Sequence, residues 1–201
     1  MTGARLILAS GSPQRKWLLE DAGYQFEIVV PREEAECGIC SNEGPAALVS
    51  ELAELKAADV INQLADQKQI TQPTIVVACD TVAECGGLVL GKPRDEQHAR
   101  SMLERLRGEL HRVYSGLCVW PVGAIPHANM LKTQLAITEL RMDSITDDNL
   151  DDYLATGLWR GKAGAFGYQD RPGWLQIVQG SESNVIGLPM ELLTEMLASF
   201  D

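Results

Sequence analysis

The first side chains that could do chemistry lie near the start of the sequence. Ser10 and Ser12 follow a short apolar segment, and Arg15 comes shortly after them. Ser12 is suited to cap a helix and Pro13 to be its first residue, so Arg15 is expected in the first helical turn. Free backbone N–H groups at a helix N-terminus, with serine hydroxyls and an arginine beside them, form an anion site. An ordinary capped helix with a charged flank is the alternative.

A second group joins a carboxylate to a lysine. Residues 75–78 form an apolar run typical of a buried strand, and Asp80 is expected at the end of that strand. Gly86 and Gly87 separate two short apolar segments, a pattern that predicts a hairpin returning Lys92 to the side of Asp80. A carboxylate beside cations suits a metal ion and a phosphate chain. From this stretch alone, a turn-capping Asp80 with solvated cations is equally compatible.

A third group lies in a glycine-rich segment, residues 157–173. So many glycines disfavour a helix interior, and the segment also carries cations and aromatic side chains. It suits a loop that closes over a ligand, with Lys162, Tyr168 and Gln169 as its polar groups.

The sequence leaves the roles of several other residues open. Lys56 lies on the apolar stripe of a long helix, where a lysine either extends to the surface or, facing a cleft, binds phosphate. Glu34 belongs to an acidic run, residues 33–36, that could ligate a metal but is more often solvated. Cys37 and Cys40 have the spacing of half a zinc site. Because no second such pair exists, two loop thiols are the favoured interpretation.

Apolar periodicity and capping residues predict the elements that must position these groups. Strands and helices alternate, which favours one α/β layered domain over residues 1–201. The predicted strands cover residues 6–9, 26–30, 75–78, 88–90, 111–114, 117–120, 131–140 and 174–178. The predicted helices cover residues 13–22, 45–65, 96–107, 147–155 and the segment after 187. In the strand 131–140, the side chains at 131, 133, 135 and 137 are expected to face a packed layer.

Composition restricts the class of protein. The chain is 45% hydrophobic, enough for a substantial core, and its net charge of −11 disfavours a general nucleic-acid binder. The apolar run at the N-terminus is too short for a signal sequence, and no stretch is long enough to span a membrane. Five scattered cysteines do not suggest a disulfide framework. We therefore expect a cytoplasmic protein that binds neither nucleic acid nor membranes.

Taken together, the motifs resemble the Maf family of nucleotide pyrophosphatases. The matching segments are LILASGSPQR, Leu55-Lys56-Ala57, ACDTV, GKPRDEQHARSML, Tyr114-Ser115-Gly116, KAGAFGYQ and SNVIGLP, in the family's order over nearly the whole chain. The resemblance implies an α/β fold with a mixed central sheet flanked by helices. It also implies two lobes around a cleft, as in inosine triphosphate pyrophosphatase-like proteins, and a homodimer. The implied reaction converts a nucleoside triphosphate to its monophosphate and pyrophosphate with a divalent metal, Mg²⁺ or Mn²⁺.

The resemblance also assigns roles to individual residues. It places Ser10, Ser12 and Arg15 at the triphosphate, Lys56 and Lys92 at the phosphates as catalytic cations, and Asp80 as the catalytic carboxylate. Lys162 and Gln169 would line the active site and base pocket, and Asp80 with Glu34 would hold the metal. Asp80 as metal ligand and Asp80 as general base both remain open, as does the number of metal ions.

Two departures from the family pattern concern the substrate and the metal. Gln14 stands where the family commonly has the first of two arginines, and the segment around Glu34 matches with a one-residue ambiguity. Gln169, in the sequence Gly167-Tyr168-Gln169, favours the branch that acts on dTTP and UTP. The alternatives are a pyrophosphatase for 7-methyl-GTP or another modified nucleotide, a phosphatase releasing orthophosphate, and a nucleotide-binding regulator of cell division.

Overall fold

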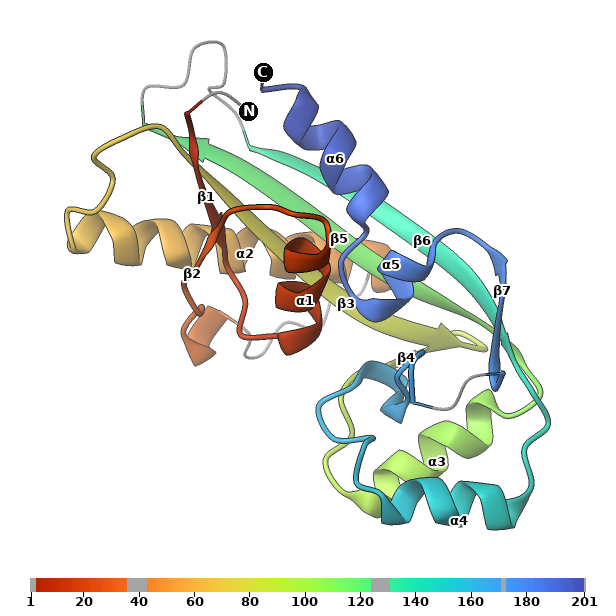
Figure 1. The fold of residues 1–201 in the computed structure, drawn as a ribbon. Helices are drawn as coiled ribbons and strands as arrows, with labels where there is room; N and C mark the ends of the chain where they lie inside the picture. Colours follow the sequence, from red (N-terminus) through yellow and green to blue (C-terminus); the bar gives the residue numbers. More distant parts are fainter. Residues whose placement is uncertain (1–2, 36–42, 124–130, 171–172, 201) are drawn as a thin grey trace.

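The computed structural model describes residues 3–35, 43–123, 131–170 and 173–200. Seven strands form one mixed sheet in the order β2-β1-β3-β5-β6-β7, with β4 paired to β3 (Figure 1). The strands are β1 (Arg5–Leu8), β2 (Glu27–Ile28), β3 (Thr74–Cys85), β4 (Leu88–Leu90), β5 (Leu110–Val122), β6 (Lys132–Met142) and β7 (Leu175–Gln179). The helices are α1 (Pro13–Asp21), α2 (Pro45–Asp66), α3 (Glu96–Leu106), α4 (Asp147–Ala155), α5 (Glu182–Ile186) and α6 (Met190–Ala198), with single 3-10 turns η1 (Glu33–Ala35) and η2 (Ala163–Ala165).

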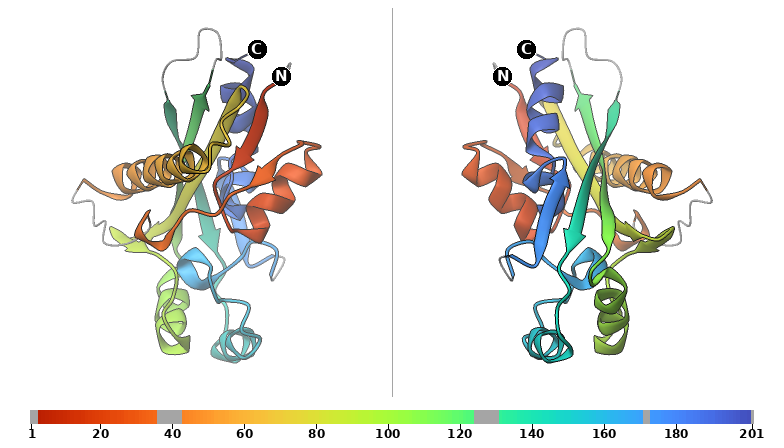
Figure 2. Two further views of the ribbon diagram at one scale, coloured as in Figure 1. Left: turned by 90° about the vertical axis from the view of Figure 1, so that its left-hand side faces the viewer. Right: turned by 90° about the vertical axis from the view of Figure 1, so that its right-hand side faces the viewer.

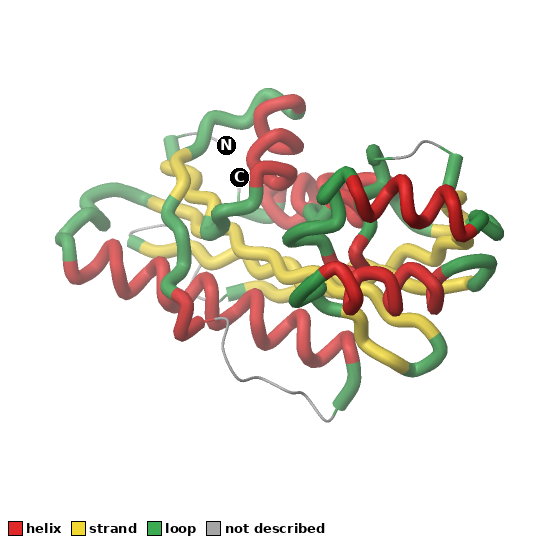
Figure 3. The backbone as a smooth tube through the Cα atoms, turned by 90° about the horizontal axis from the view of Figure 1, so that it is seen from below, coloured by secondary structure: helices red, strands yellow, loops and turns green. Residues whose placement is uncertain are grey.

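The long strands β3, β5 and β6 run through two lobes, each with its own helices (Figures 1 and 3). In the first lobe α2 covers one face of the sheet and α1 and α6 cover the other (Figure 2). In the second lobe α3 and α4 pack on the far ends of the same strands. The mixed sheet, its flanking helices and the two lobes confirm the predicted fold. None of the helices in the described ranges is long and apolar enough to cross a membrane.

A glycine in β5 sets how closely α2 approaches the sheet. Gly116 pairs with Asp80 of β3, and a Cβ atom at this position would lie 2.3 Å from the backbone oxygen of Val49 in α2. Since a contact that short is impossible, any larger residue would push the helix away. The side chain that α2 presents to Asp80, Lys56, is placed by this close packing.

The edge of β3 changes partners in its middle. β1 pairs with β3 in parallel as far as Val77, and β4 pairs antiparallel with it from Ala83 onward. Residues 78–82 of this edge therefore lie between the two pairing strands. The prediction that Asp80 ends a strand is wrong, because β5 pairs with β3 continuously on its other edge. Asp80 instead lies within β3, in the interval between its pairing with β1 and its pairing with β4.

Two other details differ from the predictions, and a third is not tested. The predicted strands at 111–114 and 117–120 are one continuous strand, β5. Leu131, just before β6, packs against the hydrophobic cluster beneath α2, but Leu135 and Ile137 in β6 are 37% and 46% exposed. The well-buried side chains of β6 are on its opposite face, including Leu140 and Met142. The interpretation of Cys37 and Cys40 lies outside the described residues.

Candidate active site

A cavity of about 470 Å³ lies against the gap between β1 and β4. Its wall includes residues from both lobes, so the two groups of helices enclose it from opposite sides. Eight residues predicted from the sequence line it: Ser10, Ser12, Arg15, Lys56, Asp80, Lys92, Lys162 and Gln169. Segments that are far apart in the chain are thus brought to one site of a size suited to a small ligand.

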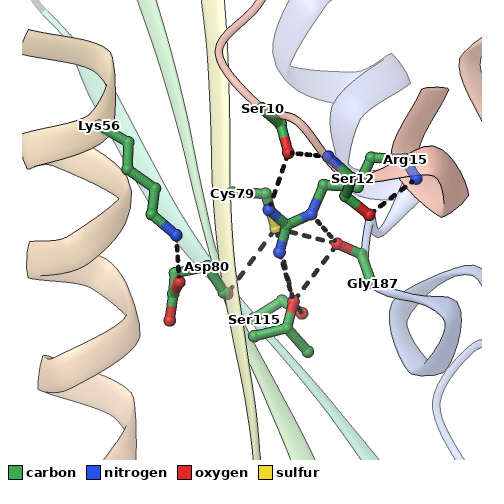
Figure 4. A network of polar contacts seen from close by, with 9 residues as sticks. Ser10, Ser12, Arg15, Lys56, Cys79, Asp80, Ser115 and Gly187 are labelled. Atoms are coloured by element: carbon green, nitrogen blue, oxygen red, sulfur yellow. Dashed lines mark hydrogen bonds and ion pairs between the residues drawn. The ribbon is translucent and has the colours of Figure 1, made fainter. Parts of the chain in front are cut away.

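The carboxylate and one lysine form an ion pair on the α2 side of β3. The Nζ atom of Lys56 lies 2.5 Å from Oδ1 of Asp80, and these side chains are 6% and 14% exposed (Figure 4). Lys56 therefore does not extend to the surface, although it comes from the apolar stripe of α2. Both residues nevertheless line the cavity, which makes this pair a charged element of the site.

Arg15 lies on the opposite side of β3, held by three protein acceptors (Figure 4). Its Nε donates to the backbone oxygen of Gly187 at 2.8 Å. Its two terminal nitrogens donate to the hydroxyls of Ser10 and Thr81, each at 3.3 Å. A guanidinium group carries five N–H donors, so one on each terminal nitrogen remains beyond these three bonds. Arg15 is consequently fixed in orientation and still able to donate to an anion.

The acceptor at Gly187 is positioned by α5, a helix that sequence reasoning missed. Ser181 caps α5, and the Asn184 amide donates to the backbone oxygen of Val113 at 3.2 Å and the Thr138 hydroxyl at 2.9 Å. These contacts fasten α5 to β5 and β6, and Gly187 ends the helix. The Ser181 cap was the available sequence signal, but a five-residue helix is too short to show periodicity.

The start of α1 has the predicted capped geometry. Ser12 is its N-cap and accepts from the backbone N–H of Arg15 at 3.5 Å, which confirms the prediction for this helix start. The Ser10 hydroxyl accepts from the backbone N–H of Ser12 at 3.1 Å. The Ser12 hydroxyl donates to Oε1 of Gln14 at 3.0 Å, so the Gln14 side chain folds back over the cap. Gln14 also lines the cavity.

Two lysines reach the cavity from the second lobe. Lys92 follows β4 as the predicted hairpin requires, is exposed, and makes no hydrogen bond or ion pair with the described residues. Lys162 belongs to the glycine-rich loop and pairs with Asp170 at 2.5 Å. The two segments are tied together, because the N–H of Gly164 donates to the backbone oxygen of Gly91 at 3.1 Å.

The carboxylates at the cavity bear on the predicted metal. Asp80 lines the cavity, whereas Glu34 does not and its neighbour Glu33 does. In the part of the chain that is described, no three His, Cys, Asp or Glu side chains converge as a metal site. Mg²⁺ is commonly held by one or two carboxylates together with substrate phosphates rather than by an all-protein cage. Asp80 and Glu33 fit that mode of binding.

Apolar side chains of the second lobe and one buried histidine also line the cavity. The apolar residues include Val113, Leu140, Met142 and Phe166. His111 also lines the cavity, and its Nδ1 lies 3.5 Å from the backbone oxygen of Glu109. Burial lowers the pKa of its imidazole. Sequence reasoning missed His111. The signal was its alternation with Val113 in β5, which places both side chains on one face of the sheet.

Comparison with known proteins identifies relatives over nearly the full chain. A family model described as "Maf-like protein" matches residues 5–200. A protein of Rhodopirellula baltica named "dTTP/UTP pyrophosphatase" is 45% identical, covering 98% of this chain and 82% of that protein. One of Alkaliphilus metalliredigens with the same name is 36% identical, covering 96% and 94%. "The structure of the Staphylococcus aureus Ham1 protein" aligns with 98% of this chain and all of that chain, at 13% identity and a TM-score of 0.45.

Proposed function

Because this chain belongs to the Maf-like protein family, we propose that it hydrolyses dTTP and UTP to the monophosphate and pyrophosphate. The observation that carries this proposal is the cavity itself. Its wall combines cationic side chains from three segments, the carboxylate of Asp80, and a group of apolar side chains from the second lobe. A nucleoside triphosphate has the matching distribution of charge, with a polyanionic tail and a flat base.

The cationic groups bind the triphosphate from three directions. Arg15 and the hydroxyls of Ser10 and Ser12 approach from the start of α1, where backbone N–H groups also favour an anion. Lys56 approaches from α2, and Lys92 from the hairpin. Arg15 binds with its two remaining N–H groups in a fixed orientation, since Gly187, Ser10 and Thr81 hold its other three donors. Lys92 has the freedom to follow the leaving pyrophosphate.

Asp80 acts through one of its two oxygens. Oδ1 accepts from Lys56, so Oδ2 is the oxygen that can face an attacking water or a metal ion. Water bonds to the α-phosphorus through its oxygen and loses a proton to Asp80 or to solvent, while the bond from that phosphorus to the bridging oxygen breaks and pyrophosphate leaves with the added negative charge. Lys56 and Lys92 stabilise this charge in a site partly shielded from water. The hydrogen bond from the Lys56 ammonium also orients Asp80 for either role.

A divalent metal completes the charge balance of the proposed reaction. Asp80 and Glu33 would hold Mg²⁺ or Mn²⁺ together with substrate phosphate oxygens. When bound, the ion neutralises phosphate charge and polarises the reacting phosphoryl group.

Gln169 is the residue we assign to the base. It lines the cavity in the loop that also carries Lys162, on the lobe opposite α1. Its amide offers both a donor and an acceptor, which match O4 and N3–H of uracil or thymine. Gln169 is exposed, so a bound base would cover its amide, and a base with a different edge would leave that amide unpaired.

Dimerisation and cellular location complete the proposal. The exposed Leu135 and Ile137 side chains on β6 give an apolar surface that a homodimer would cover. Cys79, Cys85 and Cys118 are buried free thiols, as suits a protein of the cytoplasm.

A substrate screen tests the proposed function. Purified protein with Mg²⁺ is given dTTP, UTP, CTP, dATP, GTP and 7-methyl-GTP, and released pyrophosphate is measured. We expect dTTP and UTP to have the highest kcat/KM. Preference for 7-methyl-GTP would overturn the substrate, and absence of pyrophosphate release from every nucleotide would overturn the enzymatic function.

A further inference from the structure

Asp170 is a carboxylate next to the active site that has no part in the reaction described above. Its side chain is 9% exposed, and it is not among the residues that line the cavity. Lys162, Gly167 and Gln169, which surround it in the same loop, do line the cavity. Asp170 therefore lies behind the cavity wall, where it can touch the wall but not the ligand.

Three groups converge on this one carboxylate. Lys162 Nζ contacts both of its oxygens, at 2.5 Å for Oδ1. The Tyr153 hydroxyl lies 2.6 Å from Oδ2, and the N–H of Gly167 donates to Oδ2 at 3.0 Å. A Cβ atom at Gly167 would lie 2.8 Å from Lys162 Nζ and 2.9 Å from Oδ2, so any larger residue there would displace the ends of these two side chains. The cluster is packed too closely to be a chance surface ion pair.

Tyr153 connects the cluster to the core of the second lobe. It is fully buried in α4, and its ring packs on Phe166 and Trp174 with centroid distances of 5.0 and 5.8 Å. Its hydroxyl also lies 3.2 Å from the backbone oxygen of Ala165. The carboxylate thus joins a rigid point in the core to a loop with several glycines, which has little conformational preference of its own.

We infer that Asp170 is a positioning residue that holds Lys162 and the Gly167–Gln169 segment in place against the nucleotide. An ammonium group has three N–H donors. With two directed at the oxygens of Asp170, tetrahedral geometry turns the third away from the carboxylate, toward the cavity that Lys162 lines. Without Asp170 the flexible lysine side chain would extend into water instead. This inference rests on the proposed nucleotide hydrolysis.

A double-mutant cycle with Lys162 tests the inference. Asp170→Asn, Lys162→Met and the double variant are compared with wild type for kcat/KM on dTTP and for melting temperature. We expect Asp170→Asn to lower kcat/KM about 10- to 100-fold, as for partners that orient a binding group. In the Lys162→Met background the same change should have little further effect, because the lysine is gone and the asparagine oxygen can still accept from the N–H of Gly167.

Matched variants separate positioning from general stability. Asp151→Asn makes the same change on α4, where the carboxylate pairs with Arg100 at the surface, and should leave kcat/KM within about 2-fold of wild type. If Asp170→Asn folds too poorly to assay, Asp170→Glu goes through the same cycle, with a smaller loss expected that again vanishes beside Lys162→Met.

The outcomes distinguish the two proposals. Equal losses from the Asp170 change with and without Lys162, or no loss at all in an active wild type, overturn the positioning role alone. A wild-type protein that releases no pyrophosphate from any nucleotide overturns the proposed function and the positioning role with it.

Discussion

Replacing Asp80 with asparagine should weaken both the fold and the activity, for one electrostatic reason. The change keeps the shape but removes the negative charge 2.5 Å from the Lys56 ammonium, in a pair that is 6% and 14% exposed. Breaking a buried ion pair outright costs about 3–5 kcal/mol. Asparagine still offers an acceptor, so the loss should fall below that range, at about 2 kcal/mol. In a protein of this length that lowers the melting temperature by about 4–8 °C.

The activity of Asp80→Asn should fall by about two orders of magnitude or more, because the charge that holds a metal or activates water is lost. Adding Lys56→Met removes the second charge, so the melting temperature should recover while activity stays low. Glu27→Gln serves as the control, since it weakens the ion pair with Arg5 in an exposed position and should alter neither property much. Asp80→Asn with wild-type melting would refute the buried pair. Wild-type activity would refute the role of Asp80.

Three further changes probe other parts of the site. Lys92→Ala should lower kcat/KM by about 10- to 100-fold with an unchanged melting temperature, because Lys92 is exposed and makes no hydrogen bond or ion pair with the described residues. Gln169→Ala should reduce the ratio of kcat/KM for dTTP over GTP more than it lowers the rate with dTTP; an unchanged ratio would exclude Gln169 from base recognition. Burial lowers the pKa of His111, so the unfolded chain takes up a proton below about pH 6.5 that the folded protein resists, and stability falls there. His111→Gln should therefore show a smaller drop in urea midpoint between about pH 7.5 and about pH 5.5 than wild type does. An equal drop in both proteins would show that other groups cause the loss of stability at low pH.

The sequence predicted most elements that carry the site, because their signals are local. Ser12 caps α1, Asp95 caps α3 and Thr146 caps α4, as their residue types and the apolar positions that follow predict. Gly86 and Gly87 turn the β3–β4 hairpin. These features brought the predicted cations and Asp80 to one cavity.

The remaining features depend on contacts between distant segments. The sequence suggests that a strand ends at Asp80, because polar residues interrupt the apolar run there. Pairing with β5 nevertheless continues β3 beyond Asp80. Alternation in β6 predicts two faces but not how far a helix covers either of them, so Leu135 and Ile137 are exposed where the pattern predicts a packed layer. The convergence of Lys162, Tyr153 and Gly167 on Asp170 requires a loop to fold back on α4, which no spacing in the sequence reveals.

The position of water attack tests the proposed chemistry most directly. Hydrolysis of dTTP in water enriched in ¹⁸O, followed by mass spectrometry of the products, shows which phosphorus accepts the new oxygen. Attack at the α-phosphorus predicts one ¹⁸O atom in dTMP, unlabelled pyrophosphate, and no dTDP. Label in pyrophosphate, or dTDP with labelled orthophosphate, would contradict it.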